Sequence, residues 1–311
     1  MTKTVDTTAS VDLIAVLVAL TGEMPVVLTI EDGKAFPSGP LESGHRTLQT
    51  GLRSWVERQT HHPLGYIEQL YTFADRDRVY EGGSRRVISI SYLGLVRQGP
   101  PSGDQVPGWQ SWYRYFPWED WREGVPSLIA QGIMPRLEDW VAQCNDSRIR
   151  RVRAQRVHTT FSRDARVWNE ELVLQRYELL YEAGLVAEAC PERSKLECKL
   201  FGDPMVLDHR RILATGIARL RAKIKYRPVV FELMPLSFTL LQLQRTVEAL
   251  AGRRLHKQNF RRLVQEQGLV EPTGNVASGT AGRPAQLFRF QRKVLRERAV
   301  SGTKLPLSHA I

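Results

Sequence analysis

Four side chains that can hydrogen bond to nucleic acid stand close together near the C-terminus: Lys257, Gln258, Arg261 and Arg262. At these spacings they share one side of a helix. The apolar residues of the same segment fall on the other side: Phe260, Leu263 and Val264. Arginine and glutamine reach base edges in the major groove, while lysine and further arginines meet phosphates. The pattern therefore predicts a helix that lies in the major groove of DNA.

The charge of the surrounding segment agrees with this interpretation. Residues 253–298 include eleven Lys or Arg and three acids, which leaves +8 of the chain's net charge of +11. A strongly basic segment either meets a polyanion or forms a solvated basic face, and charge alone does not separate the two. The order of the predicted elements favours the first alternative.

The elements that must position these side chains have clear boundaries. Thr239 and Gln242 form a capping-box pattern that starts a helix, and Gly252 is suited to its left-handed end. A second helix is expected over 256–267, followed by a strand at 269–270, a Gly-rich loop over 273–284 and a strand over 286–290. Helix, turn, helix and β-hairpin form a winged helix-turn-helix. The residues predicted to contact DNA are Thr239, Arg254, His256, Lys257, Gln258, Asn259, Arg261, Arg262 and Arg283.

A second set of polar residues with regular spacing lies on a predicted amphipathic helix over 45–59. Residues 36–65 resemble the Nudix box, in which glutamates of one helix hold Mg²⁺ on a pyrophosphate. Gly39, Arg53 and Glu57 match the pattern, whereas glutamates are replaced at three positions: His45, Ser54 and Arg58. One carboxylate beside a cation is a poor Mg²⁺ site. The resemblance therefore implies a Nudix-like domain that is not an enzyme, with no catalytic residue, no catalytic cofactor and no metal site.

The resemblance extends along most of the chain. It is carried by residues 66–73, 75–77, 86–95, 207–209, 231–235, 238–240, 259–262 and 282–285. These stretches are similar to the Nudix-related transcriptional regulators of the NrtR and NadQ type, and the extra segment 117–201 makes the chain most similar to the NadQ branch. The resemblance implies a repressor of NAD-biosynthesis genes that binds a palindromic operator as a homodimer. It also implies that the Nudix-like domain senses NAD, ADP-ribose or ATP.

A site for such a nucleotide needs cations for the pyrophosphate and an aromatic or apolar clamp for the base. The candidates are Phe36, Arg53, Glu57, Tyr71, Phe73, Arg85 and Arg86. Each has a structural alternative. Arg53 and Glu57 are spaced as a surface pair on one helix, aromatic residues on strands commonly belong to the core, and the two adjacent arginines open a strand from a polar loop.

The chain of 311 residues is long enough for two domains. We expect an α+β fold: a Nudix-like mixed-sheet domain over 1–116, a helical insertion and connector over 117–228, a winged helix-turn-helix over 229–300 and a tail over 301–311. Three cysteines without metal-ligand spacing fit a reducing compartment. The apolar stretch 11–20 is too short to cross a bilayer, and the N-terminus does not resemble a signal peptide. The sequence therefore predicts a cytoplasmic protein with no membrane contact.

Two other function classes remain open at this stage. The first is an active Nudix pyrophosphohydrolase acting on ADP-ribose or NAD, against which Ser54 and Arg58 argue. The second is a protein that binds nucleic acid without sequence preference. The arginine-rich segment 148–166 also has three interpretations: a solvated helix face, a second phosphate contact, or part of a dimer interface. The aromatic cluster over 109–121 is expected to pack in the core.

Overall fold

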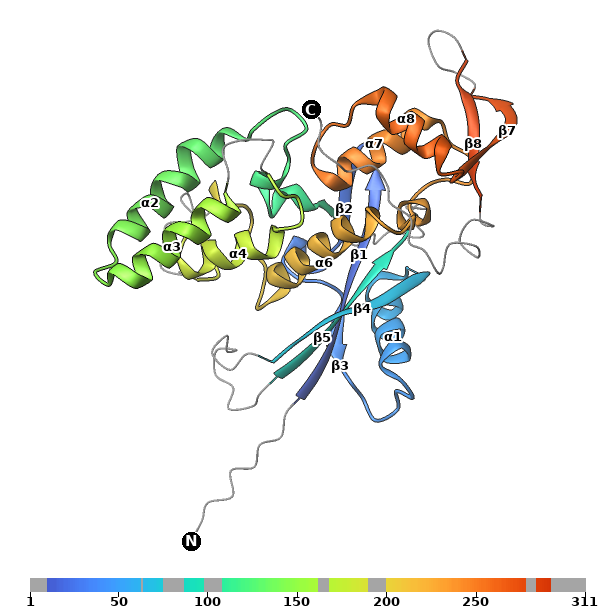
Figure 1. Cartoon of the computed structure of the whole chain (residues 1–311). Coiled ribbons are helices and arrows are strands. Elements are labelled where there is room, and N and C mark those ends of the chain that lie inside the picture. The colour runs from blue at the N-terminus through green and yellow to red at the C-terminus, as the bar shows by residue number, and fades with distance from the viewer. Residues whose placement is uncertain are drawn as a thin grey trace.

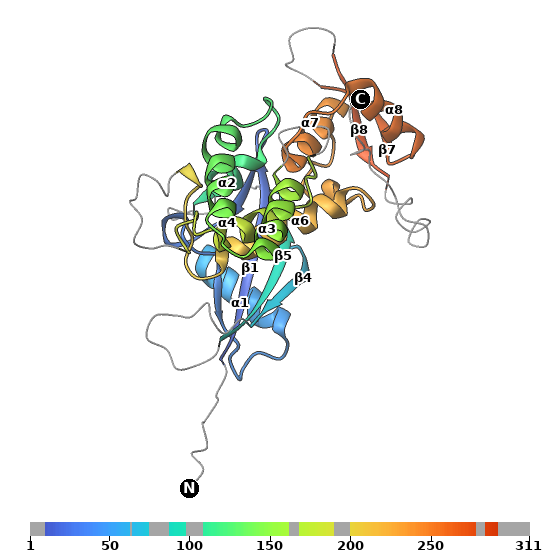
Figure 2. The same cartoon turned by 60° about the vertical axis from the view of Figure 1, so that its left-hand side comes forward.

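The computed structural model describes residues 10–62, 64–74, 87–97, 108–161, 168–189, 200–277 and 284–291. Its first part is a mixed sheet flanked by helices, and a group of helices lies beside it (Figure 1). The C-terminal helices and hairpin lie together at one end of the molecule, as the turned view also shows (Figure 2). Among the described residues, no helix is long and apolar enough to cross a bilayer.

The sheet is built around β1 (Ser10–Thr21). It pairs in parallel with β5 (Val87–Leu95) and in antiparallel fashion with β2 (Met24–Leu28) and β3 (Ser38–Pro40). The outer strands are β4 (Tyr66–Phe73) and β6 (Trp109–Ser111), giving the order β4-β5-β1-β2-β6. The predicted mixed sheet is confirmed.

The two faces of β1 are covered by different helices because side chains alternate along a strand. Residues 13, 15 and 17 pack with Leu52 and Val56 of α1 (Leu48–Thr60). Residues 14, 16 and 18 face the core that includes α6 (His209–Ile224). Gly216 of α6 lies against Val16, where a Cβ would be 3.6 Å from the valine side chain. The sheet is thus the middle layer between the two helices.

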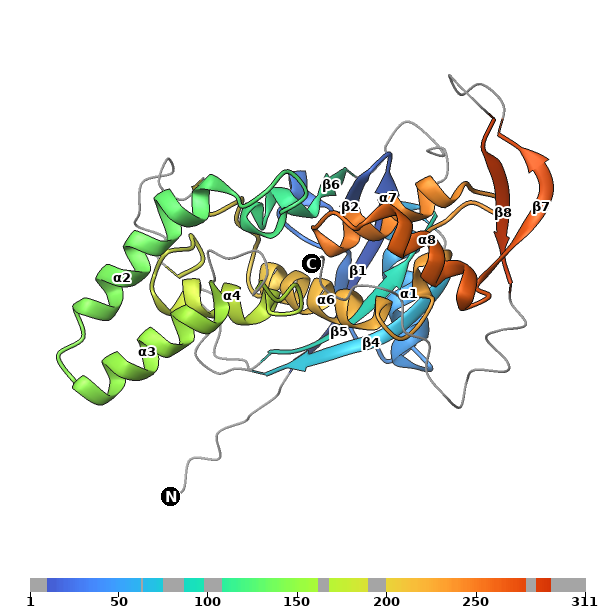
Figure 3. The same ribbon diagram turned by 45° about the horizontal axis from the view of Figure 1, so that its top comes forward.

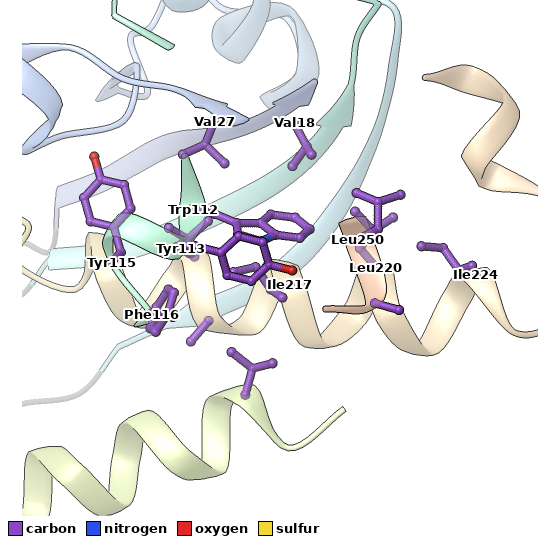
Figure 4. Close-up of a cluster of buried hydrophobic side chains, with 14 of the residues drawn as sticks. Val18, Val27, Trp112, Tyr113, Tyr115, Phe116, Ile217, Leu220, Ile224 and Leu250 are labelled. Atoms are coloured by element: carbon purple, nitrogen blue, oxygen red, sulfur yellow. The ribbon is translucent and has the colours of Figure 1, made fainter. Parts of the chain in front are cut away.

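The segment after β6 fills the space between the sheet and the inserted helices. It contains η2 (Trp112–Arg114) and η3 (Pro117–Glu119). Its aromatic rings pack against β1, β2 and α6, as Figure 4 shows for Trp112, Tyr113 and Phe116. The prediction that this aromatic cluster belongs to the core is confirmed.

The described part of the insertion consists mainly of three helices: α2 (Met134–Ala142), α3 (Ser147–Thr160) and α4 (Val173–Glu182). A π-helical turn, η4 (Ile129–Ile133), leads without a break into α2. Pro135 lies at the start of α2 and lacks the N–H that a regular helix would use there. The helices α2 and α3 form an antiparallel hairpin that projects to one side of the molecule (Figure 3).

A single buried carboxylate joins the insertion to α6. Glu119 of η3 is fully buried and receives hydrogen bonds from Arg176 of α4 at 2.5 and 3.0 Å. Arg221 of α6, also fully buried, donates to Oε2 of the same carboxylate at 2.5 Å. These three residues, the Glu119 triad, connect η3, α4 and α6.

A buried histidine lies at the start of α6. Asp208 occupies the N-cap position, and its side chain makes no capping hydrogen bond. His209 is buried, and its Nδ1 accepts a hydrogen bond of 2.8 Å from the Phe36 backbone N–H. The imidazole also stacks on the Phe36 ring, with centroids 5.7 Å apart. Burial lowers the pKa of His209 to about 4.

This histidine predicts a pH-dependent stability. The pKa of the imidazole falls from 6.5 to about 4 on folding, so the unfolded chain takes up a proton in that interval and the folded chain does not. The stabilisation that comes from burying the neutral imidazole should therefore be present in full above pH 6.5. As the pH falls toward 4, the free energy of unfolding should decrease by up to about 3 kcal/mol. Urea unfolding at a series of pH values checks this. His209→Gln, which keeps an acceptor for the Phe36 N–H, should flatten the dependence, whereas His158→Gln on an exposed face of α3 should preserve it.

Candidate nucleic-acid interface and ligand site

The first helix of the C-terminal region begins as its sequence predicts. In α7 (Leu240–Ala251), the Thr239 hydroxyl accepts from the Gln242 backbone N–H at 3.1 Å, and the Gln242 side chain accepts from the Thr239 N–H at 2.8 Å. The predicted capping box is confirmed. Thr239 was also a predicted DNA contact, but its side chain is buried and serves the cap. We correct its role to helix capping.

The turn after α7 is fixed by buried polar contacts. Gly252 has a φ of +73°, in the left-handed region that favours glycine. A Cβ there would clash with the Glu119 carbonyl oxygen. The buried Glu248 accepts hydrogen bonds from Gln244 Nε2 at 2.8 Å and from the Leu255 N–H at 3.0 Å. These contacts hold the turn in one conformation.

Arg254, at the end of this turn, was predicted to contact DNA. It pairs with Glu123 at 2.6 Å and with Glu248 at 3.2 Å. Its hydrogen bonds with Glu123 and Glu248 raise the pKa of Arg254. Its guanidinium is exposed but already paired, so its observed contacts are with the turn and with Glu123 at the start of the insertion.

The second helix, α8 (Lys257–Glu266), separates its faces as predicted. Phe260 and Val264 are buried, and Leu263 is half-buried. The side chains of the N-terminal turn point to solvent: His256, Lys257, Gln258 and Asn259. Arg262 is exposed beside Glu266 at 3.4 Å. Arg261 is half-buried, and its buried Nε has no hydrogen-bond partner among the described residues.

The hairpin after α8 completes the winged helix. β7 (Val270–Val276) pairs with β8 (Gln286–Phe290) in antiparallel fashion. Phe288 also pairs with Phe238 just before α7, through backbone hydrogen bonds of 2.8 and 2.9 Å. Sequence reasoning missed this third segment, because a single bridge has no periodic pattern. The tip of the wing, including the predicted DNA contact Arg283, lies outside the described residues.

The box helix retains the structural features of the Nudix pattern. A Cβ at Gly39 would clash with the Trp55 ring, so the glycine allows this packing. Arg53 donates hydrogen bonds to the backbone carbonyls of Leu64 and Gly65. Gly39 and Arg53 therefore support the packing and the loop around α1.

The replaced box positions contact one another or nearby backbone. Arg58 lies over the Trp55 ring at 4.4 Å and donates to Ser54 Oγ at 3.0 Å. His45 Nδ1 accepts a 3.1 Å hydrogen bond from the Glu42 N–H. Glu57 is exposed. In the described part of the chain, no three His, Cys, Asp or Glu side chains come together as metal ligands.

The five nucleotide-site candidates that the structure describes do not form one site, although the rings of Tyr71 and Phe73 contact each other with centroids 4.9 Å apart. Arg53 and Glu57 belong to α1, on one face of the sheet, whereas Phe36 and Phe73 belong to the core on the other face. Phe36 is 0% and Phe73 4% exposed. Their interpretation as base-stacking rings is corrected to core packing. Tyr71 is 56% exposed and is an available ring. The other two candidates, Arg85 and Arg86, lie outside the described residues.

The sheet domain meets the winged helix at a cleft that sequence reasoning did not anticipate. The cleft has a volume of about 680 Å³ and lies between the β1–β2 turn, residues 233–235 and α7. Arg245 of α7 forms an ion pair across it with Glu23 of the turn. Beside the cleft, the Tyr113 hydroxyl donates to the Ala249 carbonyl at 2.6 Å, and Arg221 Nε donates to the Leu250 carbonyl at 2.9 Å. The end of α7 is thus bound directly to the rest of the molecule.

Comparisons with known proteins agree with this architecture. Residues 230–290 match the family model of the NrtR DNA-binding winged helix domain. Over 87 residues, 28% of this chain, the sequence is 44% identical to the ADPR responsive transcriptional repressor NtrR of Acinetobacter baylyi. The match spans about a third (34%) of that relative's own length.

Solved structures show the same fold over nearly the whole chain. Shewanella oneidensis NrtR superposes with a TM-score of 0.54 and 16% identity, covering 94% of this chain and 97% of that one. The structure of its complex with a 27mer DNA superposes with a TM-score of 0.51 and 18% identity, covering 92% of this chain and 95% of that one. A MutT/nudix family protein from Enterococcus faecalis superposes with a TM-score of 0.51 and 15% identity, covering 91% of this chain and 87% of that one. The predicted combination of a Nudix-like domain and a C-terminal winged helix is confirmed.

Proposed function

Because this chain has the fold of the NrtR-type regulators and its residues 230–290 match their DNA-binding winged helix, we propose that it is a DNA-binding transcriptional repressor. The observation that carries the proposal is the exposed N-terminal turn of α8. Lys257, Gln258 and Asn259 project from a helix whose opposite face is buried. These side chains supply the donors and acceptors that read base edges and bind phosphates.

The proposed DNA site is a palindromic operator bound by a homodimer. One winged helix presents one recognition helix, which reads a few base pairs of one half-site. Two copies related by a twofold axis would read the two halves of a palindrome. The genes controlled are proposed to be those of NAD biosynthesis, and the protein would act on them in the cytoplasm.

The effector is proposed to be ADP-ribose, because the Acinetobacter relative is described as ADPR responsive; NAD and ATP are the alternative nucleotides. Glu57 and Tyr71 are the described candidates that are exposed enough to contact it. Arg85 and Arg86 are proposed to bind its phosphates.

Binding at the Nudix-like domain would act on DNA through the junction with α7. A ligand shifts such an equilibrium only if it binds two arrangements with different affinity. The ion pair between Glu23 and Arg245 and the contacts of Tyr113 and Arg221 with α7 are the physical links between the parts. A change in the β1–β2 turn would reach the recognition helix through them.

The Nudix-like domain is proposed to have no hydrolase activity. Of the three helix positions at which the box has glutamates, only Glu57 retains a carboxylate. Ser54 and Arg58 hydrogen bond with each other. An arginine at a position that would hold Mg²⁺ repels the cation, which argues against the alternative of an active pyrophosphohydrolase.

A mobility-shift experiment tests the proposed function. The probes are the DNA upstream of this chain's own gene and promoters of NAD-biosynthesis genes, with competitor DNA and with or without ADP-ribose, NAD and ATP. We expect a shift that resists competitor and changes with one nucleotide. A shift that competitor abolishes and no nucleotide alters would indicate non-specific binding instead. In parallel, Mg²⁺-dependent turnover of ADP-ribose or NAD would identify the protein as a hydrolase.

A further inference from the structure

The helix α3 carries arginines that the fold does not use. The helix has five arginines and no acidic residue. Two of them have partners: Arg153 lies over the Trp140 ring at 4.0 Å, and Arg156 pairs with Glu182 at 2.5 Å. The remaining three are exposed and have no carboxylate within ion-pair distance in the part of the chain that the structure describes: Arg148, Arg150 and Arg151.

The position of these three residues opposes helix formation. They occupy the first turn and a half of α3, where the helix dipole is positive and disfavours cations. They also repel one another at short spacing. Asp146 offsets part of this cost by accepting hydrogen bonds from the N–H groups of Arg148 and Ile149 at 2.8 and 3.0 Å. The stability of the fold therefore does not account for three cations at this helix end, and an anionic partner would.

The surface is accessible for a large partner. The hairpin of α2 and α3 projects away from the sheet (Figures 1 and 3). Ile149 and Val152, which lie among the arginines, are themselves 48% and 51% exposed. No neighbouring element of the described chain covers this end of α3. The three arginines and the backbone that carries them are open to solvent.

We propose that the N-terminal half of α3 is a second DNA-binding surface, at which Arg148, Arg150 and Arg151 bind the phosphate backbone outside the half-site read by α8. The inference rests on the proposed function. Once α8 has bound its site, flanking phosphates are held near the same molecule at high effective concentration, so weak contacts add to affinity. A twofold contact between copies through this surface is disfavoured, because it would place the same arginines of both copies against each other.

The test is the salt dependence of operator binding by the triple variant Arg148→Gln/Arg150→Gln/Arg151→Gln. Each lost phosphate contact lowers the slope of log K against log salt by about 0.9. The variant's slope should therefore be smaller by about 2 to 3, with affinity reduced about 10- to 100-fold near 0.15 M salt. The ratio of operator to non-operator affinity should stay the same, because phosphate contacts carry no sequence information.

A matched control separates this surface from overall charge. The variant Arg46→Gln/Arg219→Gln/Arg227→Gln makes the same change in net charge at three other exposed arginines and should leave the slope nearly unchanged. On a duplex trimmed to the operator, the wild type and the α3 variant should bind alike. The proposal is overturned if the α3 variant keeps the wild-type slope or if the control variant changes the slope equally. It is also overturned if the α3 variant changes the oligomeric state of the protein and leaves the slope unchanged. If the wild type itself shows no operator preference, the proposed function fails instead.

Discussion

Replacing Lys257 or Arg261 by alanine is expected to weaken operator binding by about 10- to 100-fold while leaving nucleotide binding intact. Lys257 is exposed at the first position of α8, and Arg261 follows one turn later. A lost base or phosphate contact at such a helix costs about 1–3 kcal/mol of binding free energy. Among the described residues, no hydrogen bond or ion pair joins either side chain to the sheet domain, so the effect should be confined to DNA.

Titration of a labelled operator by fluorescence anisotropy measures this loss, with calorimetric titration of ADP-ribose as the companion assay. Arg219→Ala, at an exposed position of α6, is the matched control and should bind the operator normally. Arg261 is half-buried, so its replacement could lower stability, and the thermal unfolding of Arg261→Ala is compared with that of the wild type. Lys257 is exposed, so Lys257→Ala needs no such comparison. Normal operator affinity in both variants would show that α8 is not the recognition helix.

The winged helix could be predicted closely because its boundaries are local. A capping box at Thr239 and Gln242 and a left-handed glycine at position 252 act over three or four residues, so sequence spacing alone places them. The buried and exposed faces of α8 follow from the helical period in the same way.

The ligand candidates were harder to predict because burial depends on contacts that are distant in sequence. Phe36 packs on His209, which lies 173 residues away. Phe73 lies under Arg211, whose guanidinium is 4.9 Å from the ring centroid. An aromatic residue on a strand has the same local pattern whether it stacks on a base or on the core. The pairing of Glu119 with two arginines from other helices had no sequence pattern at all.

The Glu119 triad also places the insertion next to α7 and α8. Arg221 donates to the Glu119 carboxylate and to the Leu250 carbonyl, and the Trp121 N–H donates to the Gly252 carbonyl at 2.7 Å. The turn between α7 and α8 is therefore packed on the same buried charges that join η3, α4 and α6. A disturbance of the triad should reach both the insertion and the winged helix.

Glu119→Ala is expected to lower the free energy of unfolding by about 3–5 kcal/mol. The change removes the only carboxylate that contacts both buried guanidiniums among the described residues. Arg176 and Arg221 would then be left as uncompensated charges in the core, each 0% exposed. Glu119→Gln keeps the size and one acceptor oxygen but not the charge, so its stability should fall between those of the wild type and the alanine variant.

Urea unfolding of the three proteins at one pH measures this order, and the control is Glu182→Ala. Glu182 also pairs with an arginine at 2.5 Å, but both side chains are more than 40% exposed. An exposed pair contributes about 1 kcal/mol or less, so the two alanine variants make the same chemical change in opposite environments. If Glu119→Ala lowers the free energy of unfolding no more than Glu182→Ala does, the buried triad does not hold the insertion on α6. If it costs several times more, the same carboxylate should also be needed for full operator binding, because Arg221 loses the anchor from which it holds the end of α7.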